Sequence, residues 1–238
     1  MNRKIITKKY NHLFFDLDNT LWDFSYDAKK TFEKLISKYN LLAKIDSNNP
    51  DLFLQAYKKH NLQLWEEYKK EEITKEHLSL ERFRRPLSDF GCQDKSFAKK
   101  LSEDYIETLS GFVTLFPETI SILDYLKPKY NLHAITNGFE EVQIKKLMIS
   151  GLNKYFSCII TSEMAEVRKP DKAIYDFSLS KAGATSGECL MIGDDPESDI
   201  EGASAAGIDQ CWLKLNETDN CIDATYVICS LGELKGFL

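Results

Sequence analysis

Short apolar runs recur along this chain and alternate with amphipathic segments over its second half. The runs lie at 12–17, 132–136, 158–161, 189–193, 210–213 and 225–228. Apolar residues at helical spacing fill the segments 118–126, 140–149, 172–182 and 198–206. Uninterrupted runs of this length are typical of strands buried on both faces, and their alternation with helices is typical of βαβ units. We therefore predict an α/β fold in which helices flank a parallel sheet.

The segment between residues 25 and 110 departs from this alternation. It contains few β-rich runs, and its large apolar residues recur at helical intervals, as in Phe32, Leu35 and Ile36. Pro86 predicts a break within it. Because the segment directly follows the first strand, we interpret it as a helical cap over a site at that strand's end, rather than as a packed appendage. The predicted boundaries make residues 1–22 and 112–238 the core and residues 23–111 the cap.

Composition and charge narrow the classes of function. The chain has 238 residues, 43% of them hydrophobic, and a net charge of -6, which argues against a nucleic acid polymer as partner. The six cysteines include no C-x-x-C pair or zinc-site spacing, so they are interpreted as reduced thiols. No apolar stretch reaches the length of a membrane span, and the basic N-terminal stretch lacks an apolar signal region. We expect a cytoplasmic protein without a membrane partner.

The first apolar run ends in two carboxylates, Asp16 and Asp18, separated by Leu17. In open parallel sheets, ligands bind beyond the carboxyl ends of the strands, where these side chains would lie. An acidic turn is the alternative interpretation, since Asp is an ordinary turn residue. The pattern becomes informative only if other strand ends carry matching chemistry.

Two further segments supply hydrogen-bond donors and a cation. Thr136 and Asn137 end the second run before Gly138, and a hydroxyl with freed backbone N–H groups can hold phosphate oxygens. The alternative is an ordinary Asn-Gly turn. Lys169 precedes Pro170, which we place in the first turn of the following helix. Lys169 would then lie near a helix N-terminus, where anions are favoured, and its flexible ammonium could pair with both an aspartate and a phosphate. A solvated surface lysine is the alternative.

The fourth apolar run leads into the most acidic strand end of the chain, Gly193-Asp194-Asp195-Pro196-Glu197-Ser198-Asp199. Oxygen ligands alone suit Mg²⁺, which also retains water when it meets a substrate phosphate. Turn formation and helix capping offer a structural role for Asp195 and Ser198. We accept that role for Ser198 and assign Asp194 and Asp199 to metal binding.

In this order, each at a predicted strand end, the four elements resemble the motifs of the haloacid dehalogenase-like (HAD) hydrolase superfamily. The motifs are a D-x-D-x-[TV] element, a Ser or Thr, a Lys and an acidic G-D element. They are matched by Asp16 and Asp18, Thr136, Lys169, and Asp194 and Asp199. The resemblance implies a Rossmann-like HAD core with an inserted C1-type cap.

The resemblance also implies a Mg²⁺-dependent phosphatase. Asp16 would be the nucleophile that forms an aspartyl-phosphate, and Asp18 the general acid and base. The metal would be held by Asp16, Asp194, Asp199 and the backbone carbonyl of Asp18. Catalytic Lys169, with Thr136 and Asn137, would bind the substrate phosphate. Those are the catalytic, metal and substrate residues that we predict.

The substrate is the least determined part of this prediction. Trp65, Arg82 and Phe83 in the predicted cap, with Phe139 and Glu140, are similar to the YjjG-like 5'-nucleotidases. We therefore expect a small phosphorylated metabolite, specifically a deoxynucleoside or nucleoside 5'-monophosphate. The alternatives are N-acylneuraminate-9-phosphatase, phosphoglycolate or sugar phosphatase and phosphosugar mutase. A 2-haloacid dehalogenase is disfavoured by Asp18, and a non-catalytic binding protein by the complete motif set. A monomer and a homodimer are both compatible with the sequence.

Overall fold

The computed structural model describes residues 10–45, 49–216 and 222–238. The chain divides into two compact units. Met1–Phe24 and Val113–Leu238 form one, here called the α/β unit, and Ser25–Phe112 form the other, here called the helical unit. Within the described residues, no helix combines the length and the apolar character that crossing a membrane requires.

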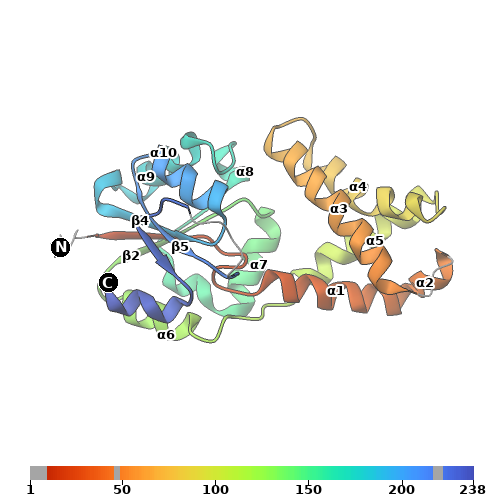
Figure 1. Cartoon of the computed structure of the whole chain (residues 1–238), viewed down its shortest axis with the longest axis horizontal. Helices are drawn as coiled ribbons and strands as arrows, with labels where there is room; N and C mark the ends of the chain where they lie inside the picture. Colours follow the sequence, from red (N-terminus) through yellow and green to blue (C-terminus); the bar gives the residue numbers. More distant parts are fainter. Residues whose placement is uncertain (1–9, 46–48, 217–221) are drawn as a thin grey trace. The chain divides into compact units, whose positions relative to one another are not determined.

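A parallel six-stranded sheet forms the centre of the α/β unit (Figure 1). Its strand order is β3-β2-β1-β4-β5-β6, and every neighbouring pair is parallel. The strands are β1 (His12–Phe15), β2 (Asn131–Thr136), β3 (Cys158–Thr161), β4 (Cys189–Gly193), β5 (Asp209–Leu213) and β6 (Tyr226–Ile228). The predicted α/β fold with a parallel sheet is confirmed. The first strand is shorter than predicted, because it ends at Phe15 rather than at residue 17.

Helices cover both faces of this sheet. The longer ones are α6 (Thr119–Leu126), α7 (Glu140–Ser150) and α9 (Lys172–Ala182). Shorter turns are η1 (Leu152–Tyr155), α8 (Ser162–Ala165), η2 (Ser186–Glu188), η3 (Pro196–Glu201), α10 (Gly202–Ala205) and η4 (Leu231–Gly236). The helix predicted over 198–206 is instead a π-helical turn, η3, followed by the single turn α10.

Alternation along β1 builds two separate cores. Leu13 and Phe15 pack in one cluster with residues of α6 and α7, whereas Phe14 packs in the other with Ile174 and Tyr175 of α9. Successive side chains of a strand point to opposite faces, so a fully apolar strand contributes to both. β1 lies between β2 and β4. The residues that follow these three strands therefore meet at one edge of the sheet.

The helical unit is built from α1 (Phe24–Tyr39), whose first residue still belongs to the α/β unit, and from α2 (Leu41–Lys44), α3 (Pro50–Lys69), α4 (Lys75–Asp89) and α5 (Lys95–Leu109). The N-cap side chains of α3, α4 and α5 are Asn49, Thr74 and Asp94, and each accepts a backbone N–H of its own first turn. Aromatic side chains fill the core of this unit, namely Phe32, Tyr57, Phe83 and Tyr105. The break predicted at Pro86 is wrong, because α4 continues through this buried residue.

Candidate active site

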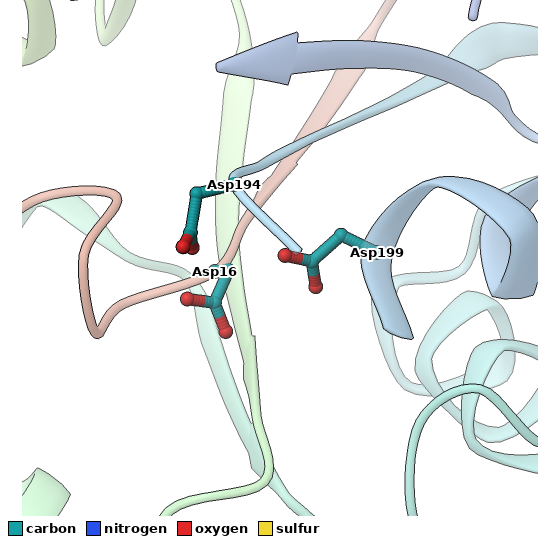
Figure 2. A group of neighbouring side chains, drawn as sticks. All are labelled: Asp16, Asp194 and Asp199. Atoms are coloured by element: carbon teal, nitrogen blue, oxygen red, sulfur yellow. The ribbon is translucent and has the colours of Figure 1, made fainter. Parts of the chain in front are cut away.

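Three carboxylates converge at the carboxyl edge of the sheet (Figure 2). Asp16 follows β1 directly, Asp194 follows β4, and Asp199 lies in η3. One carboxylate oxygen from each lies within 4.8 Å of the others. The backbone N–H of Asp16 donates to Ile192 O at 2.9 Å, which extends the β1–β4 pairing to the carboxylate itself. The sheet therefore fixes the spacing between residues that are far apart in the sequence.

Lys169 joins two of these carboxylates. Its Nζ lies 2.6 Å from Asp16 Oδ1 and 2.6 Å from Asp199 Oδ1, and it donates to Ile135 O at 3.2 Å. Burial opposes the charge on this ammonium, but the nearby Asp16 and Asp199 outweigh it and raise the pKa of Lys169 well above its usual value. Lys169 is thus a buried, charged member of the cluster.

The carboxylates carry more negative charge than Lys169 offsets. Burial, against the attraction of Lys169, raises the pKa of Asp16 well above its usual value, and the charges of Asp199 and Asp194 add to this. Burial and the charge of Asp199 raise the pKa of Asp194 to about 7. Burial likewise raises the pKa of Asp199. Such a cluster favours a cation that would compensate the remaining charge.

Backbone and hydroxyl donors hold the acidic segment in place. Thr20 Oγ1 donates to Asp194 Oδ1 at 3.0 Å, and Trp212 Nε1 of β5 donates to Asp194 O at 3.0 Å. Asp195 is the N-cap of η3, because its Oδ1 accepts the N–H of Ser198 at 2.6 Å. This N-cap begins the turn that carries Asp199 to the cluster. The side chain of Asp195 is therefore engaged in capping η3.

Asn137 supports Lys169 through the main chain. Its Nδ2 donates to Lys169 O at 2.8 Å, and its Oδ1 accepts Lys169 N–H at 2.9 Å. Both ends of the amide are engaged, so the structure gives Asn137 a supporting role, and substrate binding by this residue stays a prediction. The predicted placement of Pro170 is wrong, because α9 begins at Lys172 with Asp171 as its N-cap.

Thr136 lies at the end of β2 and is buried. Its Oγ1 accepts the N–H of Gly138 at 3.0 Å, which fixes the first turn of the loop after the strand. The hydroxyl can still donate its own hydrogen to another group, because accepting a hydrogen bond does not use that hydrogen. The structure therefore places a hydroxyl donor at the predicted strand end.

Asp18 lies outside the acidic cluster and has its own set of donors. Trp22 Nε1 donates to its Oδ1 at 2.6 Å, and Gln143 Nε2 donates to its Oδ2 at 2.5 Å. Lys146 Nζ lies 3.4 Å from Oδ1. The two aspartates of the first motif therefore occupy different environments, one among carboxylates and one among donors.

Thr20 fills the last position of the D-x-D-x-[TV] element, but the contacts of Asp18 with Trp22, Gln143 and Lys146 were not identified from the sequence. A signal for the last two existed. Gln143 and Lys146 lie at positions i and i+3 of α7, beside Val142 and Leu147 on its buried face, where helical periodicity calls for apolar side chains. A buried Gln and Lys at such positions indicate a polar partner beneath the helix.

Comparisons with known proteins agree with this arrangement. A family model described as haloacid dehalogenase-like hydrolase matches residues 10–207. Pyrimidine 5'-nucleotidase YjjG of Escherichia coli is 31% identical over 233 residues, which cover 97% of this chain and 98% of YjjG. Pyrimidine 5'-nucleotidase PynA of Streptococcus pneumoniae is 32% identical over 237 residues, which cover 94% of this chain and 93% of PynA.

A solved structure shows the same likeness in three dimensions. The magnesium-bound crystal structure of the HAD-hydrolase YfnB from Bacillus subtilis matches with a TM-score of 0.86 at 28% identity. The match covers 96% of this chain and 98% of that chain. The chain belongs to the haloacid dehalogenase-like hydrolases.

Proposed function

We propose that this protein is a Mg²⁺-dependent phosphatase that hydrolyses small phosphomonoesters through an aspartyl-phosphate intermediate. The observation that carries the proposal is the cluster of Asp16, Asp194 and Asp199 with the ammonium of Lys169 at the carboxyl edge of the sheet. Such a site combines a carboxylate nucleophile with cationic charge, which is what phosphoryl transfer requires.

The donor set fits Mg²⁺. All three groups are carboxylates, which are the oxygen ligands that Mg²⁺ prefers, and one oxygen of each lies within 4.8 Å of the others. Asp16, Asp194 and Asp199 would hold the ion, together with the backbone carbonyl of Asp18. When bound, Mg²⁺ neutralises charge on phosphoryl oxygens and aligns the phosphate.

In the first half-reaction, an Asp16 carboxylate oxygen attacks phosphorus, and the bond between phosphorus and the leaving oxygen breaks. The bonding electron pair stays on that oxygen, which takes a proton from Asp18. In the second half-reaction, water attacks phosphorus while Asp18 accepts its proton, and the electron pair of the broken acyl phosphate bond returns to Asp16. Both aspartates are thereby restored.

Lys169 and Thr136 complete the phosphate site in this proposal. The ammonium of Lys169 already contacts Asp16, so it would face the phosphoryl oxygens as they meet the nucleophile. The hydroxyl of Thr136 can donate to the same group. Asn137 would act through the Lys169 backbone that it holds.

We further propose that the helical unit serves as the cap that was predicted for residues 23–111, over a core of residues 1–22 and 112–238. Its insertion directly after the Asp16 and Asp18 segment supports this role. A cap would exclude water and select substrates. The cytoplasmic location and the choice between monomer and homodimer stay predictions from the sequence.

Pyrimidine nucleoside 5'-monophosphates and their deoxy forms are the substrates we expect first. Two relatives that align over nearly the whole chain are named pyrimidine 5'-nucleotidases. Deoxynucleoside and nucleoside monophosphates, acylneuraminate 9-phosphate, phosphoglycolate and hexose phosphates should be compared by phosphate release, with Mg²⁺ and with a chelator. We expect the highest kcat/KM for a pyrimidine nucleotide, and no release after chelation.

Asp16→Asn is the matched control for that panel, because it keeps the side-chain volume and removes the nucleophile. A preference for a sugar phosphate would redirect the substrate assignment and leave the chemistry intact. Full activity after complete removal of divalent metal, or in purified Asp16→Asn, would refute the chemistry itself.

A further inference from the structure

We propose that Gln143 and Lys146 of α7 are positioning residues that aim the carboxyl group of Asp18 at the reacting oxygen. The inference rests on the proposed function, because it assigns a task to the residues around the proposed acid and base. Three features of the structure support this positioning role: the donor geometry around Asp18, the burial of the Lys146 ammonium, and the confinement of the Gln143 amide.

The donors approach Asp18 on both oxygens. Gln143 Nε2 lies 2.5 Å from Oδ2, while Trp22 Nε1 lies 2.6 Å and Lys146 Nζ 3.4 Å from Oδ1. A carboxyl group that is held at both oxygens loses the rotation about its last side-chain bond. The three donors therefore define one direction for this carboxyl group.

Lys146 is fully buried, with 0% of its surface exposed. Its Nζ lies 4.7 Å from the centre of the Trp22 ring and 5.3 Å from that of Phe24. A buried ammonium is unfavourable unless a counter-charge and aromatic faces compensate it, and an apolar side chain would pack here at lower cost. The ammonium thus lies near both Asp18 and Trp22, whose indole N–H also donates to Asp18.

Gln143 is 1% exposed, and its amide is confined on one side by Gly138. A Cβ atom at Gly138 would lie only 1.9 Å from Gln143 Nε2, so the side chain occupies the space that glycine leaves open. Its Oε1 has no hydrogen-bond partner among the residues that the structure describes. Because an amide both donates and accepts, Gln143 can hold Asp18 with or without the proton that it transfers.

The orientation of Asp18 matters most when the leaving oxygen departs poorly without a proton. An alkyl phosphate, such as a nucleoside 5'-monophosphate, releases a strongly basic alkoxide that needs a proton. An aryl phosphate such as p-nitrophenyl phosphate releases a weakly basic phenolate that leaves without one. A misdirected Asp18 should therefore slow phosphoenzyme formation from the first substrate much more than from the second.

The test compares kcat/KM for these two substrate types in full-length wild type, Gln143→Met and Lys146→Met. For the nucleotide we expect a loss of about 10- to 100-fold, and for p-nitrophenyl phosphate a loss below about threefold, because only the first reaction depends on general acid catalysis in this step. Asp18→Asn should show the same selectivity with a larger loss, and Lys146→Arg should recover part of the nucleotide activity.

Lys145→Met is the matched control, since Lys145 is the exposed neighbour on the same helix and should leave both activities unchanged. Equal losses for both substrates in Gln143→Met and Lys146→Met would indicate a general structural defect and overturn the inference. Unchanged activity for both would overturn it as well.

A second readout does not depend on turnover. The chain has three tryptophans, and the indole N–H signal of Trp22 can be assigned in a ¹H–¹⁵N spectrum with Trp22→Phe. Lys146→Met and Asp18→Asn should both shift that signal, whereas Lys145→Met should not. An unmoved Trp22 signal would refute the inference. Wild type that hydrolyses no phosphomonoester would instead refute the proposed function.

Discussion

The charge balance around Asp16 decides what each carboxylate can do. Three carboxylates share the cluster with one ammonium, and burial raises the pKa values of Asp16, Asp194 and Asp199. A bound divalent cation would favour their ionised forms, including the nucleophilic form of Asp16. The same ion would therefore prepare the nucleophile and reduce its repulsion of a phosphate dianion.

Gly193 allows Asp199 to reach this cluster. A Cβ atom at position 193 would lie 2.2 Å from Asp199 Oδ2, so Gly193→Ala must displace the carboxylate. We expect about 1–3 kcal/mol lower free energy of unfolding from the overpacking, together with weaker Mg²⁺ binding. Denaturant unfolding and titration calorimetry measure the two effects.

Gly187→Ala provides the control, because a Cβ atom at position 187 meets nothing within 4 Å. It should change neither quantity. Wild-type Mg²⁺ affinity in Gly193→Ala would show that Asp199 is not needed where the structure places it.

The site residues could be proposed from the sequence where the chemistry of a side chain is unusual for its surroundings. Carboxylates directly after apolar strands indicate function, and the structure brings Asp16, Asp194 and Asp199 together with Lys169. Gln143 and Lys146 were missed because their place on the apolar face of α7 indicates a polar partner without showing that this partner is Asp18. That contact spans 125 residues between Gln143 and Asp18, so only the folded sheet reveals it.

At the scale of elements, β2 carries a histidine in its buried interior. His133 stacks on His12 and Phe14, and its Nε2 lies 3.0 Å from His12 Nδ1. Burial, aided by the nearby His12, lowers the pKa of His133 to about 4. The neutral form is therefore the one that the folded sheet accommodates.

This shift predicts a pH dependence of stability. Between the folded value near 4 and the ordinary value of 6.5, unfolded His133 binds a proton that the folded residue does not. The free energy of unfolding should thus fall as the pH decreases through this window, with a slope approaching about 1.4 kcal/mol per pH unit. Urea unfolding from pH 7 to pH 4 measures it.

His133→Gln is the comparison, because it removes the titrating ring and keeps a polar side chain. The carboxylates of the cluster titrate in both proteins, so the difference between the two pH profiles reports on His133 and its stacked neighbour His12. Parallel profiles would show that the folded state binds this proton as readily as the unfolded chain.

A strand forms within each of the six predicted runs, although β1 ends at Phe15, because predominantly apolar runs are favoured in a sheet that helices cover. The segment after β4 was harder to predict. The side chain of Asp195 caps the chain, and a π-helical turn follows before α10, a geometry for which helical periodicity has no signature. Pro86 also lies inside α4, where its tertiary packing outweighs the usual preference of proline for helix ends.

At the scale of the whole molecule, the parallel sheet is what assembles the site. Asp16, Lys169 and Asp199 are separated by 153 and 30 residues, yet they share hydrogen bonds. The strand order explains this, because β1, β3 and β4, the strands that precede these three residues, lie in one parallel sheet in the order β3-β2-β1-β4, and parallel strands end at the same edge. The helical unit is inserted between β1 and β2 without interrupting that order.

Covalent capture of phosphate on Asp16 tests whether this carboxylate is the nucleophile. The enzyme is quenched in acid during turnover with Mg²⁺ and its best substrate, then digested and analysed by mass spectrometry. We expect one phosphoryl group on the peptide that contains Asp16, and none in Asp16→Asn. Steady release of phosphate by the wild-type enzyme, with no phosphoryl group ever found on Asp16, would contradict it.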